Sequence, residues 1–456
     1  MANQAVVVTD LSFGDASKGS TTDYLVRQAD SAVVVMHTGG AQRAHNVITP
    51  EGLHHKFAQF GSGSLVDGVR THIGPQFLIN PVSMLDEGKH LVEELGVENV
   101  WERVTVDKNA LIITPWQIAA NKLRELARGS NRHGSCGRGI GETQADCLRD
   151  PDVAVRAGDL LNPQLLWRKL EQMREMKYNQ LLDEIGKSKL KNWGIFDDSS
   201  VLSGTFDLYQ KWVELVEIVG SDYLQLLNLQ HELMVFEGAQ GVLLDEWFGF
   251  HPYTTWSTTT HENALALLDG IDFNGEVVKL GIMRAYTTRH GPGPFVTEDE
   301  KMTVTTPDYH NDTGKWQGGF RVGHLDLVAH RYALDVCGET DGLVVSCLDR
   351  LADQNEWKFC REYWLDGRYD DAHQYFEFNS SGLVTSIKVG VKDDLDYQTR
   401  LTELLSMCHP VYGSQSVANC SDPKEFLEVV EDHLGLPIRI ASFGPTAADK
   451  RTLAFA

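Results

Sequence analysis

Five short apolar segments, each ending in polar or glycine-rich residues, constrain the fold of this chain most strongly. The first two, AVVVTD at 5–10 and SAVVVMH at 31–37, are separated by roughly one helix, which is the spacing of a βαβ unit with a buried parallel sheet. Similar segments recur as KLGIMRAY (279–286), GLVVSCLD (342–349) and IRIASFG (438–444). Because ligands collect at the carboxyl ends of strands in open α/β sheets, we expect a site at these endings.

The middle of the chain is rich in predicted helix. The segment 162–185 carries Leu166, Leu170 and Met173 at helical spacing with charged residues between them, a pattern typical of an amphipathic helix packed on the core. No internal repeat and no low-complexity linker divides the chain. We therefore predict an α/β fold in one large domain, residues 1–456, whose central, mostly parallel sheet is flanked by helices and carries helical and loop insertions.

Charge and cysteine content narrow the partners and the compartment. The 41 basic and 64 acidic residues give a formal net charge of −23, which repels polyphosphate backbones and anionic membranes. We therefore expect no binding to nucleic acid or membranes, although a local basic pocket can still hold a small anion. Seven scattered cysteines without a C-x-x-C pair favour reduced thiols over disulfides or a zinc site. With no leader-like segment and no long apolar run, we expect a cytoplasmic protein.

The segment GDASKGS (14–20) follows the first apolar run and precedes a predicted helix, a position that attracts anions. Its Lys18 precedes a glycine instead of following one, so it is not the G-x-x-x-x-G-K-[ST] phosphate loop. Asp15 is either a cap of the following helix or a catalytic group. The second apolar run leads into a paired-glycine turn and His45. If the two strands are adjacent, Asp15 and His45 lie close together and can act as a base and an acid.

Three further segments place functional groups in turns. Four of the eight residues 134–141 are glycine, which lets a ligand approach the backbone closely. In EGAQG (237–241), the amide of Gln240 lies in a glycine turn, where packing explains it poorly. Arg289 precedes a Gly-Pro turn and is suited to a rigid contact with a phosphate or a carboxylate.

In combination, GRGIG (137–141), FEGAQGVLLD (236–245) and AYTTRHGPGPF (285–295) resemble the adenylosuccinate synthetases, ligases that join L-aspartate to carbon 6 of inosine monophosphate (IMP) while hydrolysing GTP. The resemblance extends from the first apolar segment to SFGPTAADKRTL (442–453). It implies a carbon–nitrogen ligase of purine biosynthesis and a homodimer. It also implies Mg²⁺ as cofactor and GTP, an IMP-like purine monophosphate and L-aspartate as the small-molecule partners.

The resemblance assigns roles to individual residues. Asp15 is expected to take the proton from purine N1, and His45 to stabilise the departing diphosphate. Gln240 is expected to be the third catalytic residue. Asp15 and the backbone carbonyl of Ala44 are expected to hold Mg²⁺. The residues expected to bind the nucleoside triphosphate are Gly14, Lys18, Gly19, Asp349, Ser442 and Gly444. Those expected to bind the purine monophosphate are Gln42, Cys136, Arg149, Gln240 and Thr255, with Arg149 reaching the nucleotide of the partner subunit. Those expected to bind the amino acid are Thr313, Lys315 and Arg321.

Several positions depart from the family pattern. Cys347 replaces a lysine beside Asp349, which leaves ATP open as an alternative to GTP. The segment 313–324 is longer than in the family pattern and keeps few basic residues of the family's arginine cluster. The identity of the amine donor is therefore left open. Arg43 stands where the family has alanine, and either holds a phosphate or points to solvent.

Retention of Asp15 favours IMP or dIMP as substrate, because a viral branch of the family that converts dGMP typically has a smaller residue at this position. Two alternatives stay open at this point. One is the same mechanism on an altered substrate such as GMP or dGMP, and the other is a nucleotide-binding protein without catalysis.

Overall fold

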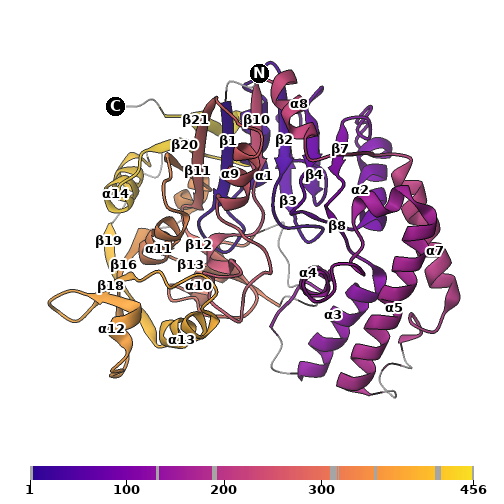
Figure 1. Ribbon diagram of the computed structural model, residues 1–456. Helices are drawn as coiled ribbons and strands as arrows, with labels where there is room; N and C mark the ends of the chain where they lie inside the picture. Colours follow the sequence, from indigo (N-terminus) through magenta and orange to yellow (C-terminus); the bar gives the residue numbers. More distant parts are fainter. Residues whose placement is uncertain are drawn as a thin grey trace.

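The computed structural model describes residues 4–129, 133–186, 190, 193–308, 316, 318–353, 357–415 and 423–453. Within them, a ten-stranded sheet forms the centre of the molecule (Figure 1). In spatial order its strands are β21 (Lys450–Thr452), β20 (Ile438–Ser442), β15 (Gly342–Ser346), β11 (Glu276–Arg284), β1 (Gln4–Asp10), β10 (Leu233–Glu237), β2 (Ala32–Met36), β5 (Arg70–Ile73), β7 (Val104–Asp107) and β9 (Glu217–Val219). All pairings are parallel except that of β20 with β21. The predicted mostly parallel α/β sheet is confirmed.

All five apolar segments form strands of this sheet, as β1, β2, β11, β15 and β20. However, β1 and β2 are not neighbours, because β10 lies between them. After β1 the chain builds β2, β5, β7 and β9 on one side, returns to insert β10, and then crosses to β11 on the other side. The strand order therefore reverses next to β1, which is where such sheets form a ligand crevice.

Helices cover the sheet and extend away from it on both sides. They are α1 (Lys18–Val26), α2 (Pro81–Glu93), α3 (Pro115–Arg128), α4 (Ile140–Arg149), α5 (Pro163–Ile185), α7 (Ser199–Val213), α8 (Tyr223–Gln230), α9 (Glu262–Asp269), α10 (Glu300–Thr305), α11 (Leu327–Cys337), α12 (Ala372–Tyr375), α13 (Leu395–Leu405) and α14 (Lys424–Leu434). Figure 1 shows α3, α5 and α7 grouped at one side of the molecule and α12 and α13 at the other. The helix predicted at 162–185 is α5, and its Leu166, Leu170 and Met173 are fully buried, as expected.

Smaller sheets surround the crevice. The hairpin β3 (His45–Ile48) with β4 (His54–Phe57) begins at the candidate acid, and the hairpin β12 (Thr287–His290) with β13 (Phe320–Gly323) carries Arg289. A five-stranded sheet comprises β14 (Leu325–Asp326), β16 (Trp357–Leu365), β17 (Phe376–Phe378), β18 (Val384–Ile387) and β19 (Cys408–Gln415), and β6 (Leu78–Ile79) pairs with β8 (Leu111–Ile112). In the part of the chain that the structure describes, no helix has the length and apolar character needed to cross a bilayer.

Candidate active site

Two cavities lie beside the loops that follow the central strands. The small cavity has a volume of about 260 Å³, and the large cavity of about 580 Å³. The residues of the small cavity that the sequence singled out are Gly14, Asp15, Lys18, Gly19, Ala44, His45, Asp349, Ser442 and Gly444. Those of the large cavity are Gln42, Cys136, Gln240, Thr255 and Arg289. Apart from Arg149, the two groups that the resemblance assigned to two different nucleotides therefore line two different cavities.

The loops of the two cavities touch at Gly14 and Gln240. A Cβ atom built on Gly14 would lie 3.1 Å from the Cα atom of Gln240, and Gly14 has a φ of +102°, so a side chain here would be both strained and crowded. Gln240 itself adopts a left-handed φ of +54°, an uncommon conformation for a residue with a side chain. This contact brings Asp15, the residue after Gly14, to the boundary between the cavities.

The GDASKGS loop is organised by Asp10, the last residue of β1. The Asp10 carboxylate accepts hydrogen bonds from the backbone N–H groups of Ser12 and Ala16, each at 2.8 Å. It also pairs with the Lys18 ammonium at 2.9 Å, and both side chains are almost completely buried. Lys18 donates in addition to the carbonyl of Gly14 at 2.7 Å. Sequence reasoning missed Asp10, although its place directly before the loop was visible.

Asp15 is held mainly through its backbone. Its carbonyl oxygen accepts a hydrogen bond from Nε of Arg284, and Arg284 also pairs with Asp308 at 3.0 Å. Burial raises the pKa of the Asp15 carboxyl, while the positive charges of Arg284 and Lys18 oppose that rise. A half-buried carboxyl with a raised pKa at a cavity wall is suited to accept a proton.

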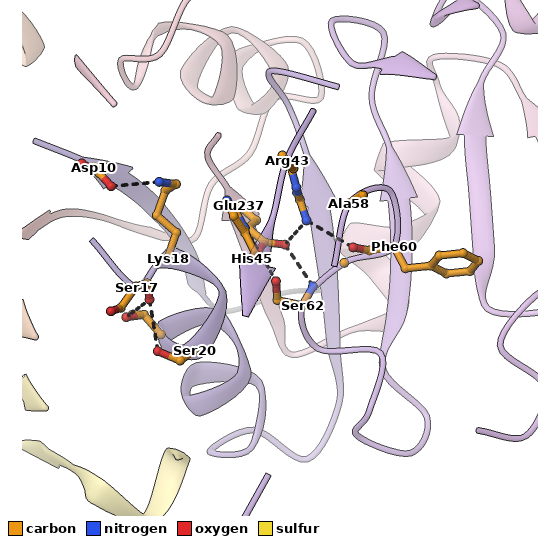
Figure 2. A network of polar contacts seen from close by, with 12 residues as sticks. Asp10, Ser17, Lys18, Ser20, Arg43, His45, Ala58, Phe60, Ser62 and Glu237 are labelled. Carbon is orange, nitrogen blue, oxygen red and sulfur yellow. Dashed lines mark hydrogen bonds and ion pairs between the residues drawn. The ribbon is translucent and has the colours of Figure 1, made fainter. Parts of the chain in front are cut away.

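His45 belongs to a buried polar network (Figure 2). Its Nδ1 lies 2.6 Å from Oε1 of Glu237, the residue that ends β10. The other carboxylate oxygen, Oε2, accepts from the backbone N–H of Ser62 at 3.0 Å and pairs with Nη2 of Arg43 at 3.3 Å. The Ser62 hydroxyl donates to Oε1 as well. The Arg43 side chain is completely buried, so the interpretation that it points to solvent was wrong. Arg43 lines neither cavity, and its proposed contact with a phosphate stays a prediction.

The network determines the charge state of its members. Burial, reinforced by the charge of Arg43, lowers the pKa of His45 to about 4 even though Glu237 opposes the change. Burial alone would raise the pKa of Glu237, but Arg43 and the hydrogen bonds from His45 and Ser62 lower it to about 2. The resting state at neutral pH thus contains a neutral imidazole that donates through Nδ1 to a carboxylate. Sequence reasoning missed Glu237 as well, although it belongs to the EGAQG turn.

The large cavity presents polar groups whose bonding capacity is not used. Both side-chain polar atoms of Gln42 and Oε1 of Gln240 are buried without a hydrogen-bond partner among the described residues. Arg289 is buried over the ring of Phe13, 4.3 Å from its centroid, and donates to the carbonyl of Pro294 at 2.6 Å, while its Nη2 has no such partner. Burial, followed by the nearby charge of Arg321, lowers the pKa of Arg289 to about 9. Such groups are available to a polar ligand.

Comparison with known proteins identifies the family. The sequence matches the adenylosuccinate synthetase family over residues 7–450. The chain belongs to this family. The adenylosuccinate synthetases of Clostridium perfringens and Clostridium novyi are 32% and 30% identical to it, over 97% of each chain.

Two solved structures share the fold. A fully ligated adenylosuccinate synthetase from Plasmodium falciparum superposes with a TM-score of 0.77 at 20% identity, over 98% of this chain and 99% of that one. The succinoaminodeoxyadenylate synthetase of cyanophage S-2L, bound to dGMP and dATP, gives a TM-score of 0.57 at 14% identity over 99% and 96% of the chains. Membership of the adenylosuccinate synthetase family makes this protein a nucleotide-binding carbon–nitrogen ligase of purine biosynthesis.

Some residues with implied roles lie outside both cavities. Arg149, at the end of α4, is exposed and lines neither. Arg321, in β13, lines neither cavity and bonds instead to Glu298 at 2.7 Å and to the carbonyl of Gly291 at 2.7 Å. Thr313 and Lys315 lie outside the described residues. The described contacts therefore do not bring together the three residues expected to bind the amino acid, and this expectation stays a prediction.

The two residues expected to hold Mg²⁺, Asp15 and Ala44, both line the small cavity. No group of three or more His, Cys, Asp or Glu side chains that could hold a metal occurs among the described residues. Because Mg²⁺ in phosphate-transfer sites commonly has one or two protein carboxylates, with phosphate oxygens and water as its other ligands, this sparse donor set is the expected one.

Proposed function

We propose that the protein joins L-aspartate to C6 of a 6-oxopurine nucleotide, IMP or dIMP, while hydrolysing GTP. The observation that carries the proposal is the place of Asp15 in the chain. Asp15 lines the small cavity together with Lys18 and His45, and it directly follows Gly14, which packs against Gln240 of the large cavity. A carboxylate at this boundary can serve a nucleobase on one side and a phosphate chain on the other.

The triphosphate is proposed to occupy the small cavity, with its phosphates against Lys18, Gly19 and His45 and its base against the loop ends. Asp349 offers a carboxylate that can accept from N–H donors of a guanine, and Ser442 and Gly444 line the same end. Mg²⁺, held by Asp15 and Ala44, would neutralise charge on the phosphates. The monophosphate is proposed to occupy the large cavity, against Gln42, Cys136, Gln240 and Thr255.

The chemistry then proceeds in two steps. The Asp15 carboxylate takes the proton from purine N1, so that the 6-oxygen attacks the γ-phosphorus and the bond from that phosphorus to the bridging β,γ-oxygen breaks. His45, beside the departing diphosphate, stabilises its charge. In the second step the amine of L-aspartate attacks C6 and expels the phosphate, and the amine loses a proton. The products are adenylosuccinate or its deoxy form, GDP and inorganic phosphate.

The amino acid and the second subunit complete the proposal. We propose that Arg321, together with Thr313 and Lys315, supplies the groups that bind the carboxylates of L-aspartate. The protein is proposed to act as a homodimer, in which the exposed Arg149 reaches the nucleotide of the partner subunit.

The decisive experiment combines purified protein, Mg²⁺ and L-aspartate with each of IMP, dIMP, GMP and dGMP, and with GTP or ATP as donor. Phosphate release and the mass of new products are measured, with Asp15→Ala as the inactive control. Product from IMP or dIMP supports the proposal. Product only from guanine nucleotides contradicts it, and no product from any pairing favours a binding protein without catalysis.

One observation favours a second candidate, the same mechanism with dGMP or ATP. The cyanophage protein that shares the fold is described as bound to dGMP and dATP. In the present chain the small cavity is lined by Cys347 beside Asp349, where the family pattern has a lysine, so the selection of guanine over adenine is weakened. The substrate panel above distinguishes this candidate directly, because each donor is tested with each monophosphate.

A further inference from the structure

We propose that Arg43 is a positioning residue for phosphoryl transfer, which acts by holding the Glu237 carboxylate that in turn orients His45. The proposal rests on the function proposed above, because it assigns His45 to the departing diphosphate. Arg43 itself lines neither cavity.

Arg43 joins three segments that are distant in sequence. It lies in the loop after β2, and its Nη2 donates both to the Glu237 carboxylate at the end of β10 (3.3 Å) and to the carbonyl of Phe60 in the loop after β4 (3.2 Å). The side chains of Arg43 and Glu237 are both completely buried. Figure 2 shows Arg43 on one side of the carboxylate and His45 on the other. The guanidinium therefore sets the carboxylate relative to both neighbouring loops.

The two oxygens of Glu237 have different partners. Oε1 accepts from His45 Nδ1 and from the Ser62 hydroxyl, whereas Oε2 accepts from Arg43 and from the Ser62 N–H. Without Arg43, Oε2 keeps one neutral donor and the buried negative charge keeps no permanent positive partner. A carboxylate in that state can rotate or draw the His45 ring toward itself, because its strongest fixed contact has gone.

The orientation of His45 matters because its ring has two nitrogens with separate duties. Nδ1 is occupied by Glu237, so Nε2 is the nitrogen left for a ligand in the small cavity that His45 lines. A carboxylate that fixes one ring nitrogen fixes the direction of the other. Since the family pattern has alanine at this position, the extra cation is a property of this chain.

The experiment compares Arg43→Met and Arg43→Lys with the matched control Arg103→Met. Arg103 is partly buried and, like Arg43, ties down the loop after β4, through the carbonyls of Ser64 and Val66 at 3.1 and 2.9 Å. No hydrogen bond joins it to Glu237 among the described residues. Two readouts are used. Long-range ¹⁵N–¹H spectra of histidine-labelled protein report the tautomer and hydrogen bond of His45, assigned with His45→Gln, and thermal unfolding of each variant reports folding.

In addition to the spectra and the unfolding measurement, a third readout isolates phosphoryl transfer. Migration of ¹⁸O between the β,γ-bridge and the β-nonbridging positions of GTP is measured with the purine monophosphate present and L-aspartate absent. We expect Arg43→Met to lose or shift the His45 Nδ1–H signal and to slow oxygen exchange by about 10²-fold, because small misplacements of a reacting group have costs of this size. The KM for the purine monophosphate should change less than about threefold, and Arg43→Lys should recover part of the exchange rate.

Three outcomes overturn the proposal. The first is an unchanged His45 signal with an unchanged exchange rate in folded Arg43→Met. The second is loss of exchange that only follows the loss of folded protein. The third is an equal effect of Arg103→Met. If the wild-type protein shows no exchange with any nucleotide pair, the proposed function fails instead, while the histidine spectra still test the Arg43–Glu237–His45 arrangement.

Discussion

The two cavities differ in how far their polar groups are satisfied before a ligand arrives. In the small cavity Lys18 is paired with Asp10, and His45 is bonded to Glu237. In the large cavity the amide of Gln42 has no hydrogen-bond partner among the described residues. Groups that face the proposed phosphates are thus set in place by neighbours, as electrostatic preorganisation requires, whereas the amide that faces the proposed purine is left for a ligand to bind. Substitutions of Lys18, His45 or their partners should therefore affect stability or chemistry strongly, and substitution of Gln42 should affect binding alone.

Asp15→Asn gives the largest expected effect. It tests a residue of the small cavity that is held through its backbone, unlike Lys18 and His45, which are held through their side chains. Among the described residues, the hydrogen bond that holds Asp15 is made by its backbone carbonyl, to Arg284, so the amide should leave folding almost unchanged. Loss of the base should lower kcat by about 10²- to 10⁴-fold. Phosphate release and thermal unfolding measure the two properties. Retention of more than about a tenth of the wild-type rate would show that another group takes the proton.

Asp10→Asn should instead act on stability. It leaves the buried Lys18 ammonium without its carboxylate, which should lower the free energy of unfolding by about 3–5 kcal/mol. Urea denaturation measures the change. The partly exposed pair of Asp371 and Arg400 provides the control, because Asp371→Asn should have a much smaller effect on stability. Equal effects of the two substitutions would contradict the preorganised small cavity.

The buried Lys450 makes the stability of this region depend on pH. It is opposite Ser442 of the small cavity across β20 and β21, and burial lowers its pKa to about 8 although Asp23 and Asp449 oppose the change. Between about pH 10 and about pH 8, Lys450 is largely protonated in the unfolded chain but largely neutral in the folded protein. Lowering the pH through this range therefore lowers the free energy of unfolding by up to about 3 kcal/mol. Chemical unfolding at both pH values measures this slope. Lys450→Met should remove it, and a slope that persists in the variant would assign it to another group.

Gln42→Ala should give the smallest effect. Because the amide bonds to none of the described residues, its removal should leave thermal unfolding unchanged and weaken binding of the purine monophosphate by about tenfold at most, the contribution of one or two neutral hydrogen bonds. Calorimetric titration measures the affinity. Gln59→Ala is the matched control, since Gln59 bonds to Asn80 at 2.7 Å and to Ser83 at 2.9 Å. This control should lose stability and keep its affinity, and the reverse pattern would contradict the comparison.

Much of the fold and of the cavity lining was predictable from local pattern. Valine-rich runs such as Val33–Val35 are fully buried because both faces of a central parallel strand are covered. The ends of such strands and the loops after them supply Gly14, Gln42 and Ser442 to the cavities. The insertion of β10 between β1 and β2 was not predictable, because strand order depends on crossover connections and not on composition.

The chain's own residues thus established a parallel α/β sheet and the family motifs at its strand ends, because periodicity, glycine turns and β-branching act over a few neighbouring positions. Only the tertiary structure decided which charge meets which. Glu237 is 192 positions away from His45, and Arg43 is two positions from His45 yet acts on it through that distant carboxylate. Burial determines such pairings, because a charge that is removed from water needs a partner, and the fold determines which residue is close enough to provide it.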